Sequence, residues 1–202
     1  MKLILASNSP RSRELLGGLD TPYEVHVIKG IDESYPNSLP VNEVAGFIAQ
    51  KKAVPYKEWF ADAQYVPSDI KMTDNTVIVT ADTVVAVDDE ILGKPVSRDD
   101  AHRMLRLISG RTHQVFTGVC LLSAKYEKSF SVCTDVTFRE LTDEEIYYYI
   151  DHYKPFDKAG AYGIQEWIGY IGVTRLEGSY FNVMGLPVQR INDELHMMAQ
   201  LL

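Results

Sequence analysis

The stretch MKLILASNSPRSRELL, residues 1–16, decides how this chain folds, because an apolar run, a polar turn and a helix start follow one another without a break. Leu3 to Ala6 predicts a short buried strand. Ser9 is placed to cap a helix whose first residue is a proline. Arg11 and Arg13 then stand in the first helical turn, where cations are unfavourable unless an anion is present. The segment predicts either an anion site or a capped helix with two solvated arginines.

The composition is that of a globular protein, with 202 residues, 46% of them apolar and 24% charged. This length suits one large domain or two small lobes. The net charge of −8 argues against a general nucleic-acid binder. An acidic protein can still bind a small polyphosphate if its basic residues converge or a divalent metal bridges the charges.

Membrane and secretory signals are also missing from the sequence. No apolar run approaches the ~20 residues of a membrane span, and the short apolar start does not predict a secretory signal. Cys120 and Cys133 fall in two consecutive predicted strands and could face each other across a hairpin. Without a sign of an oxidising compartment, we interpret them as two buried free thiols and expect a cytoplasmic protein.

Hydrophobic periodicity predicts a mixed α/β protein with two lobes around a cleft. The expected helices cover residues 10–19, 41–54, the segment from the Ser97 cap to Gly110, a segment after Thr142, and the end of the chain from Pro187. The expected strands cover residues 3–6, 23–28, 76–81 with a continuation at 84–87, and a hairpin of 113–124 and 128–139. Residues 55–75 are aromatic, polar and non-periodic, and we expect a long, mobile loop or an insertion there.

Familiar phosphate-loop, dinucleotide, hydrolase and metal-binding motifs are absent, and the five histidines lack ligand spacing. Asp82 is the strongest single candidate, because it follows an apolar run and stands between hydroxyl residues. A carboxylate in that place suits a metal ligand or a general base. The alternative is an Asx turn that closes the strand.

Further candidates are charged or amide side chains at the ends of elements. Lys94, held between a glycine and a proline, can contact a phosphate, although most surface lysines do nothing. Lys52 near the end of its predicted helix can be explained by the helix dipole alone. Glu33 can be explained as a side chain that is simply solvated. Gln165 closes the small-residue run 157–165 and offers both a donor and an acceptor to the edge of a nucleobase.

Taken in order, several segments resemble the Maf family of nucleotide pyrophosphatases over essentially the whole chain. They are Ala6-Ser7-Asn8-Ser9-Pro10-Arg11 with Leu15-Leu16, Ala81-Asp82-Thr83, Gly93-Lys94-Pro95, Ser109-Gly110 and Gly178-Ser179-Tyr180. The resemblance implies a single domain of residues 1–202 with an elongated mixed β-sheet flanked by helices, as in inosine triphosphate pyrophosphatases. Residues 157–165 are similar to the branch that acts on dTTP and UTP rather than on 7-methyl-GTP.

The resemblance also implies an activity, which is hydrolysis of a nucleoside triphosphate to the monophosphate and pyrophosphate with Mg²⁺ or Mn²⁺. It makes Asp82 the catalytic base and, with Glu33, a metal ligand. The implied substrate-binding residues are Ser7, Arg11, Arg13, Lys52, Thr83, Lys94 and Gln165.

Within this set Arg11, Thr83 and Gln165 match positions tied to substrate choice. Ser12 is a departure, since relatives often have a second basic residue there, and Arg13 is rotated by ~100° from that position.

Three questions stay open at this level. The preferred pyrimidine nucleotide, among dTTP, UTP and modified forms, is not fixed by the residues. Chain pairing is not fixed either, and a homodimer is one expectation. The alternative function is a nucleotide-binding regulator of cell division or septum formation with vestigial hydrolysis, which would bind UTP without turning it over.

Overall fold

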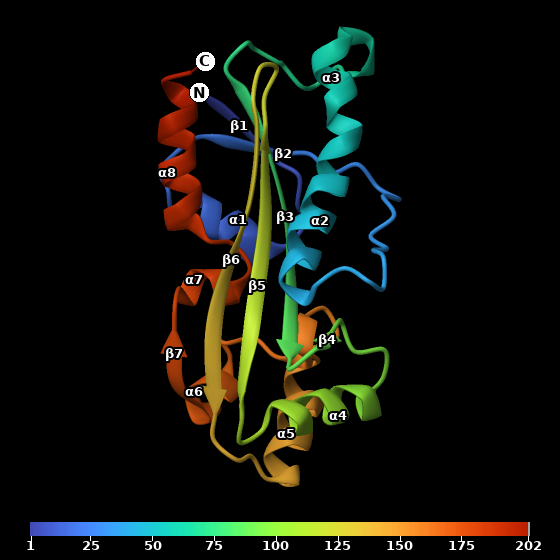
Figure 1. The fold of residues 1–202 in the computed structure, drawn as a ribbon, viewed down its shortest axis with the longest axis vertical. Coiled ribbons are helices and arrows are strands. Elements are labelled where there is room, and N and C mark those ends of the chain that lie inside the picture. Colours follow the sequence, from blue (N-terminus) through green and yellow to red (C-terminus); the bar gives the residue numbers. More distant parts are fainter. Residues whose placement is uncertain (202) are drawn as a thin grey trace. The chain divides into compact units, whose positions relative to one another are not determined.

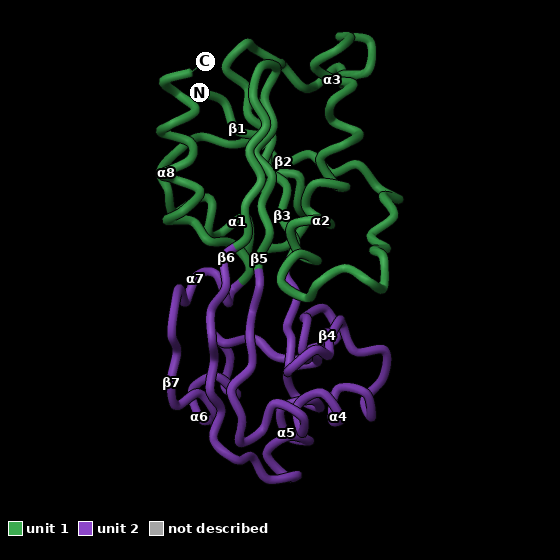
Figure 2. Tube along the Cα trace, in the orientation of Figure 1, with its two compact units in different colours: residues 1–82, 117–131, 185–202 green, residues 83–116, 132–184 purple. Residues whose placement is uncertain are grey.

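The structure, a computed structural model, describes residues 1–201 and divides the chain into two compact units, each made of separated segments (Figure 2). Unit 1 comprises residues 1–82, 117–131 and 185–202, of which the last is outside the described residues. Unit 2 comprises residues 83–116 and 132–184. The chain passes from one unit to the other within three strands, so that the boundary after Asp82 falls inside a strand.

A mixed sheet of seven strands carries the fold, with the order β2-β1-β3-β5-β6-β7 and with β4 paired to β3 (Figure 1). The strand β1 pairs in parallel with both β2 and β3, whereas β4 and β7 are antiparallel to their partners β3 and β6. The strands are β1 (Lys2–Leu5), β2 (Tyr23–Val25), β3 (Thr76–Val87), β4 (Glu90–Leu92), β5 (Thr112–Leu122), β6 (Glu127–Phe138) and β7 (Val173–Glu177). The predicted mixed α/β class is confirmed.

Unit 1 contains the helices α1 (Pro10–Gly17), α2 (Val41–Ala53), α3 (Lys57–Ala61) and α8 (Val188–Ala199). The apolar face predicted for α2 is buried, and it packs very closely on β5. A Cβ atom added at Gly118 would stand 2.3 Å from the backbone of Ala45. Only glycine therefore allows β5 to approach α2 at this point, because real Cβ atoms do not come so near to other heavy atoms.

Unit 2 contains the helices α4 (Arg98–Ile108), α5 (Asp143–Tyr153), α6 (Trp167–Gly172) and α7 (Tyr180–Met184). The predicted caps are confirmed. Ser97 Oγ accepts the Asp100 N–H at the start of α4, and Thr142 forms a complete capping box with Glu145 at the start of α5. The buried face of α4 is the predicted one, and it joins the core of the unit.

The segment 55–75 differs from the expected long loop. It begins with the 3₁₀ turn η1 (Val54–Tyr56), continues as α3 and reaches a second 3₁₀ turn, η2 (Ala63–Tyr65). Tyr56 and Trp59 are buried and stack edge-to-face with His26, which ties the segment to the loop after β2. Periodicity missed this packing because each helical piece is only a turn or so long.

Two further expectations are wrong or only half right. Both cysteines are free, but only Cys120 is buried, whereas Cys133 is exposed. Asp82 lies in the middle of β3 and not at a strand end, so the Asx-turn alternative is wrong. Among the described residues no helix is long and apolar enough to cross a membrane.

Candidate functional site

In unit 1, Lys52 joins the two predicted acidic residues. Its Nζ atom lies 2.6 Å from Asp82 Oδ1 and 3.2 Å from Glu33 Oε1. The same ammonium group also donates to the carbonyl oxygen of Ala81, at 3.4 Å. The three side chains come from the last turn of α2, the middle of β3 and the loop after β2, so residues far apart in sequence meet here. The helix dipole alone does not account for Lys52.

The position of Asp82 in β3 is partly open to solvent. Residues 81–83 are half-buried, whereas the residues before and after them in the strand are fully buried. Lys52 is 18% exposed and Asp82 is 16% exposed, as side chains. Burial by itself favours the neutral amine, but the charges and hydrogen bonds of Asp82 and Glu33 outweigh it and raise the pKa of Lys52. Lys52 is therefore held as a cation.

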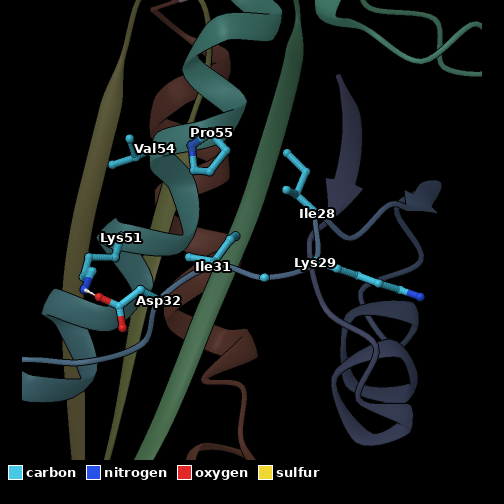
Figure 3. Close-up of a pocket in the computed structure, with 8 residues that line it drawn as sticks. Ile28, Lys29, Ile31, Asp32, Lys51, Val54 and Pro55 are labelled. Atoms are coloured by element: carbon cyan, nitrogen blue, oxygen red, sulfur yellow. Dashed lines mark hydrogen bonds and ion pairs between the residues drawn. The ribbon is translucent and has the colours of Figure 1, made fainter.

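The loop that carries Glu33 is fixed by its neighbours. Asp32 accepts hydrogen bonds from the Ser34 hydroxyl at 2.6 Å and from the Ser34 N–H at 2.9 Å. It also pairs with Lys51 Nζ at 3.0 Å, as Figure 3 shows. The bonds from Ser34, followed by that from Lys51, lower the pKa of Asp32. The Asp32–Lys51 pair, which we call the anchor, ties the loop to α2. Its two residues directly precede Glu33 and Lys52 in the sequence.

A pocket of about 380 Å³ opens between this loop and the end of α2 (Figure 3). Its walls are mostly apolar and none of the predicted site residues lines it. The lining residues are Ile28, Lys29, Gly30, Ile31, Asp32, Lys51, Val54 and Pro55. The pocket is thus separate from the Lys52 cluster, although the Asp32–Lys51 pair belongs to its wall.

The turn between β1 and α1 stands at the same level of the sheet as Asp82. Leu5 pairs with Val79, and the Ala6 N–H donates to the Val79 carbonyl at 2.9 Å. Because parallel strands advance together at about 3.3 Å per residue, Ser7 follows alongside the β3 residues next to Asp82. The Ser7 hydroxyl accepts the Ser9 N–H at 3.2 Å, which shapes the turn.

The first turn of α1 separates its two arginines. Ser9 caps the helix by accepting the Ser12 N–H, and Ser12 itself is buried. Arg11 is half-buried. Arg13 is exposed and donates to the Asn8 side chain at 3.1 Å. A basic side chain at position 12 would have to enter the core or shift the helix, because Ser12 is buried.

The remaining candidates lie in unit 2. Thr83 is half-buried in β3, and Lys94 is exposed in the turn after β4. The Gly160 N–H donates to the Gly93 carbonyl at 3.1 Å, which brings the Lys94 turn beside the segment that leads to Gln165. Lys94 and Gln165 do not contact each other directly through any hydrogen bond or ion pair within the described part of the chain.

Gln165 has a buried side-chain oxygen without a hydrogen bond, a feature that it shares with a few other residues among 1–201. Its Oε1 atom has no donor anywhere in residues 1–201. A buried acceptor left in this state costs about 1–3 kcal/mol, so native proteins rarely keep one without a reason. An incoming ligand with an N–H group would remove that cost.

Sequence reasoning missed the residues that hold these segments in place. The Asp32–Lys51 anchor and the buried Lys158, which pairs with Glu166 at 3.0 Å, were not singled out as functional. A lysine inside a run of small residues was a usable signal, because such a side chain needs a partner when it is buried.

The Lys52 cluster supplies only some of the ligands that a hard divalent cation needs. Within residues 1–201, no three or more His, Cys, Asp or Glu side chains gather at one point. Two carboxylates with a cation between them fit an ion that arrives with a polyphosphate, since Mg²⁺ commonly takes one or two protein carboxylates together with substrate phosphates.

Comparisons with known proteins match this chain to one family and to relatives that share one name. The model of the family described as "Maf-like protein" matches residues 2–198. A protein of Phocaeicola vulgatus named dTTP/UTP pyrophosphatase is 54% identical over 96% of this chain and 94% of its own length. Proteins with the same name from Parabacteroides distasonis and Flavobacterium psychrophilum are 51% and 44% identical, over 96% and 94% of this chain and 94% and 91% of their own lengths.

Proposed function

This chain belongs to the Maf family, and we propose that it is a nucleoside triphosphate pyrophosphatase that hydrolyses dTTP and UTP to the monophosphate and pyrophosphate. Identity at about half of the aligned positions, over nearly the whole length, supports the shared activity. The observation that carries the proposal is the cluster of Lys52, Asp82 and Glu33 beside the serine-rich turn at the start of α1.

Binding of the phosphates falls to the basic side chains. A triphosphate presents about four negative charges, so positioning and charge neutralisation dominate this chemistry. In the proposal, Arg11 and Lys52 hold the phosphates from unit 1, and the Ser7 hydroxyl and the N–H groups of α1 assist them. Lys94 adds a cation from the turn after β4. Arg13 contributes least, because it is exposed and already bonded to Asn8.

The proposed metal is Mg²⁺ or Mn²⁺, with Glu33 and Asp82 as its protein ligands. Carboxylate oxygens are the groups that these hard cations prefer. When bound with the nucleotide, the ion supplies charge neutralisation on the phosphate oxygens. Lys52 lies between the two carboxylates, and in the proposal its ammonium group contacts a phosphate oxygen.

Asp82 is the proposed general base. Its carboxylate takes the proton of the attacking water, the water oxygen bonds to phosphorus, and the bridging bond between the α and β phosphates breaks to release pyrophosphate. Asp82 suits this role because its side chain is neither fully buried nor fully solvated. In the same proposal, Thr83 and Gln165 select the pyrimidine base.

A panel of nucleoside triphosphates tests the proposal. Pyrophosphate release is measured from dTTP, UTP, CTP, ATP and GTP, with Mg²⁺, with Mn²⁺ and with chelator. We expect the highest kcat/KM for dTTP and UTP. Tight binding of UTP without turnover would overturn the enzyme and favour the regulator of cell division. Because nucleoside triphosphates are cytoplasmic metabolites, the proposal also places the protein in the cytoplasm.

A further inference from the structure

We propose that the hydroxyl group of Tyr149 is a positioning group, which together with Glu166 fixes the turn that presents Gln165 to the pyrimidine base. The inference rests on the proposed function and adds residues that the sequence did not single out. All of the residues involved lie within unit 2.

The turn from Gly163 to Glu166 is closed by hydrogen bonds on both sides of Gln165. The Gly163 N–H donates to Tyr149 Oη at 3.0 Å, and the Tyr149 hydroxyl donates to the Glu166 carboxylate. The Glu166 N–H donates to the Gly163 carbonyl, also at 3.0 Å. Ile164 and Gln165 thus stand between two residues that the same hydroxyl group binds.

The hydroxyl group is well suited to hold both ends of the turn. Tyr149 is fully buried in the core of unit 2, so its ring has little freedom to move. Burial raises the pKa of Tyr149, and the bond to Glu166 and the charge of Glu166 raise it further. The oxygen therefore keeps its proton and can donate to Glu166 while it accepts from Gly163.

Lys158 completes the arrangement by balancing the charge of Glu166. Its Nζ atom lies 3.0 Å from Glu166 Oε1 and 2.9 Å from Asp157 Oδ1, and its side chain is only 9% exposed. A buried lysine is stable only with such partners. Glu166 is thereby held by Tyr149 on one oxygen and by Lys158 on the other.

What the turn presents is the buried, unpartnered Oε1 atom of Gln165. Uracil and thymine carry an N3–H donor, whereas neutral cytosine has an acceptor at that position. An acceptor in a fixed place tells these bases apart, but an acceptor on a loose turn can shift to meet either edge. Base discrimination should therefore depend on the hydroxyl of Tyr149, although it touches no substrate.

The test compares discrimination rather than activity alone. In Tyr149→Phe the ring packing stays and the hydroxyl is lost, and we expect the ratio of kcat/KM for UTP over CTP to fall about tenfold, which is the effect of one hydrogen bond. Most of the change should appear as a higher KM for UTP. The matched control is Tyr153→Phe, which removes a phenolic hydroxyl from the same helix, and it should keep the wild-type ratio.

Glu166 supplies a second pair of variants in case Tyr149→Phe does not fold. We expect Glu166→Ala to lower the ratio as Tyr149→Phe does. We expect Glu166→Gln to lower it less, because the amide oxygen still accepts the Tyr149 hydroxyl although the charge pair with Lys158 is lost. An unchanged ratio in both Tyr149→Phe and Glu166→Ala overturns the inference. Equal losses for UTP and CTP overturn it too, because they would indicate a purely structural role.

A binding measurement separates this inference from the proposed function. Calorimetry with non-hydrolysable UTP and CTP analogues gives the affinity ratio without turnover. Wild-type protein that binds UTP selectively but releases no pyrophosphate contradicts the proposed activity, and the variants still test the positioning role. Active wild-type protein with unchanged ratios in the variants contradicts the positioning role alone.

Discussion

Lys52 lies between two carboxylates, with its ammonium nitrogen 2.6 Å from Asp82 and 3.2 Å from Glu33. The arrangement places a cation and two anions where a triphosphate and a metal ion would each find opposite charge. Removing one member leaves the charges of the others unbalanced, and Asp82 and Lys52 give separate predictions.

Asp82→Asn tests the general base. The amide keeps the size of the side chain and still accepts a hydrogen bond from Lys52, but it cannot take a proton. We expect kcat for dTTP to fall by about 10²–10⁴, the usual contribution of such a group, while the fold is retained. Pyrophosphate release and thermal melting check this, and near-wild-type turnover would rule Asp82 out as the base.

Lys52→Gln tests the cation through the pH dependence of stability. The raised pKa of Lys52 means that folding favours the charged amine, so its contribution is complete below the ordinary value of 10.5 and disappears as pH rises through the higher folded value. The difference in unfolding free energy between wild type and variant should stay constant from about pH 7 to 10 and shrink above that. Denaturant titrations measure it, and a difference that shrinks between pH 7 and 10 would contradict the interpretation.

Metal binding should depend on the nucleotide. Two carboxylates paired with a lysine form a weak metal site by themselves. Mg²⁺ alone, at the concentration used in the activity assay, should therefore not shift the melting temperature of the protein. Mg²⁺ with a non-hydrolysable dTTP analogue should raise it, because ligands stabilise the state they bind. Chelator should abolish pyrophosphate release, and excess Mg²⁺ should restore it. A melting shift with Mg²⁺ alone would reveal a complete protein site.

Much of the fold could be predicted because its signals are local. The caps at Ser9 and Thr142 and the periodic face of α4 are written in neighbouring residues, and the structure confirms them. The packing of residues 55–75 was not predictable in this way. Its short turns are ordered by contacts of Tyr56 and Trp59 with the distant His26.

The candidate site shows the same division. Asp82 could be found as a carboxylate that follows an apolar run, although its place inside β3 and not at the end could not. The contact of Lys52 with Asp82 and Glu33 spans distant parts of the sequence, and only the fold brings the three together. The hydrogen bonds of Tyr149 were invisible for the same reason.

The burial of His113 leads us to expect a loss of stability in mild acid. The side chain is buried in unit 2 with its Nε2 atom 2.7 Å from the Tyr162 hydroxyl, and burial lowers its pKa to about 4. The unfolded chain takes up this proton near pH 6.5 but the folded chain does not, so stability present above pH 6.5 is lost as pH falls towards 4.

The shift corresponds to about 3 kcal/mol at most, for this group alone. Unfolding free energies at pH 7 and pH 4.5 measure the loss, and NMR titration of the ring locates the pKa. The dependence of the unfolding free energy on pH should be weaker in His113→Gln, because glutamine does not take up a proton in this range. A ring that titrates near 6.5 would mean that His113 is not buried in solution.

Arg11 and Arg13 should differ strongly although they are two residues apart. Arg11 is half-buried at the start of α1, and Arg13 is exposed and bonded to Asn8. We expect Arg11→Ala to lower kcat/KM for dTTP by about 10–100-fold, as loss of a charge-assisted phosphate contact does. We expect Arg13→Ala to lower it by no more than about fivefold, since exposed ionic contacts contribute little.

Position 12, between the two arginines, is not suited to a basic side chain. Ser12 is only 6% exposed, so Ser12→Arg would bury an unpaired charge and lower the melting temperature. Ser12→Ala is the matched control and should leave stability nearly unchanged, because only the backbone N–H of Ser12 bonds to the Ser9 cap. A stable Ser12→Arg protein with improved KM for dTTP would instead show that α1 can rotate to bring a basic side chain at position 12 out of the core.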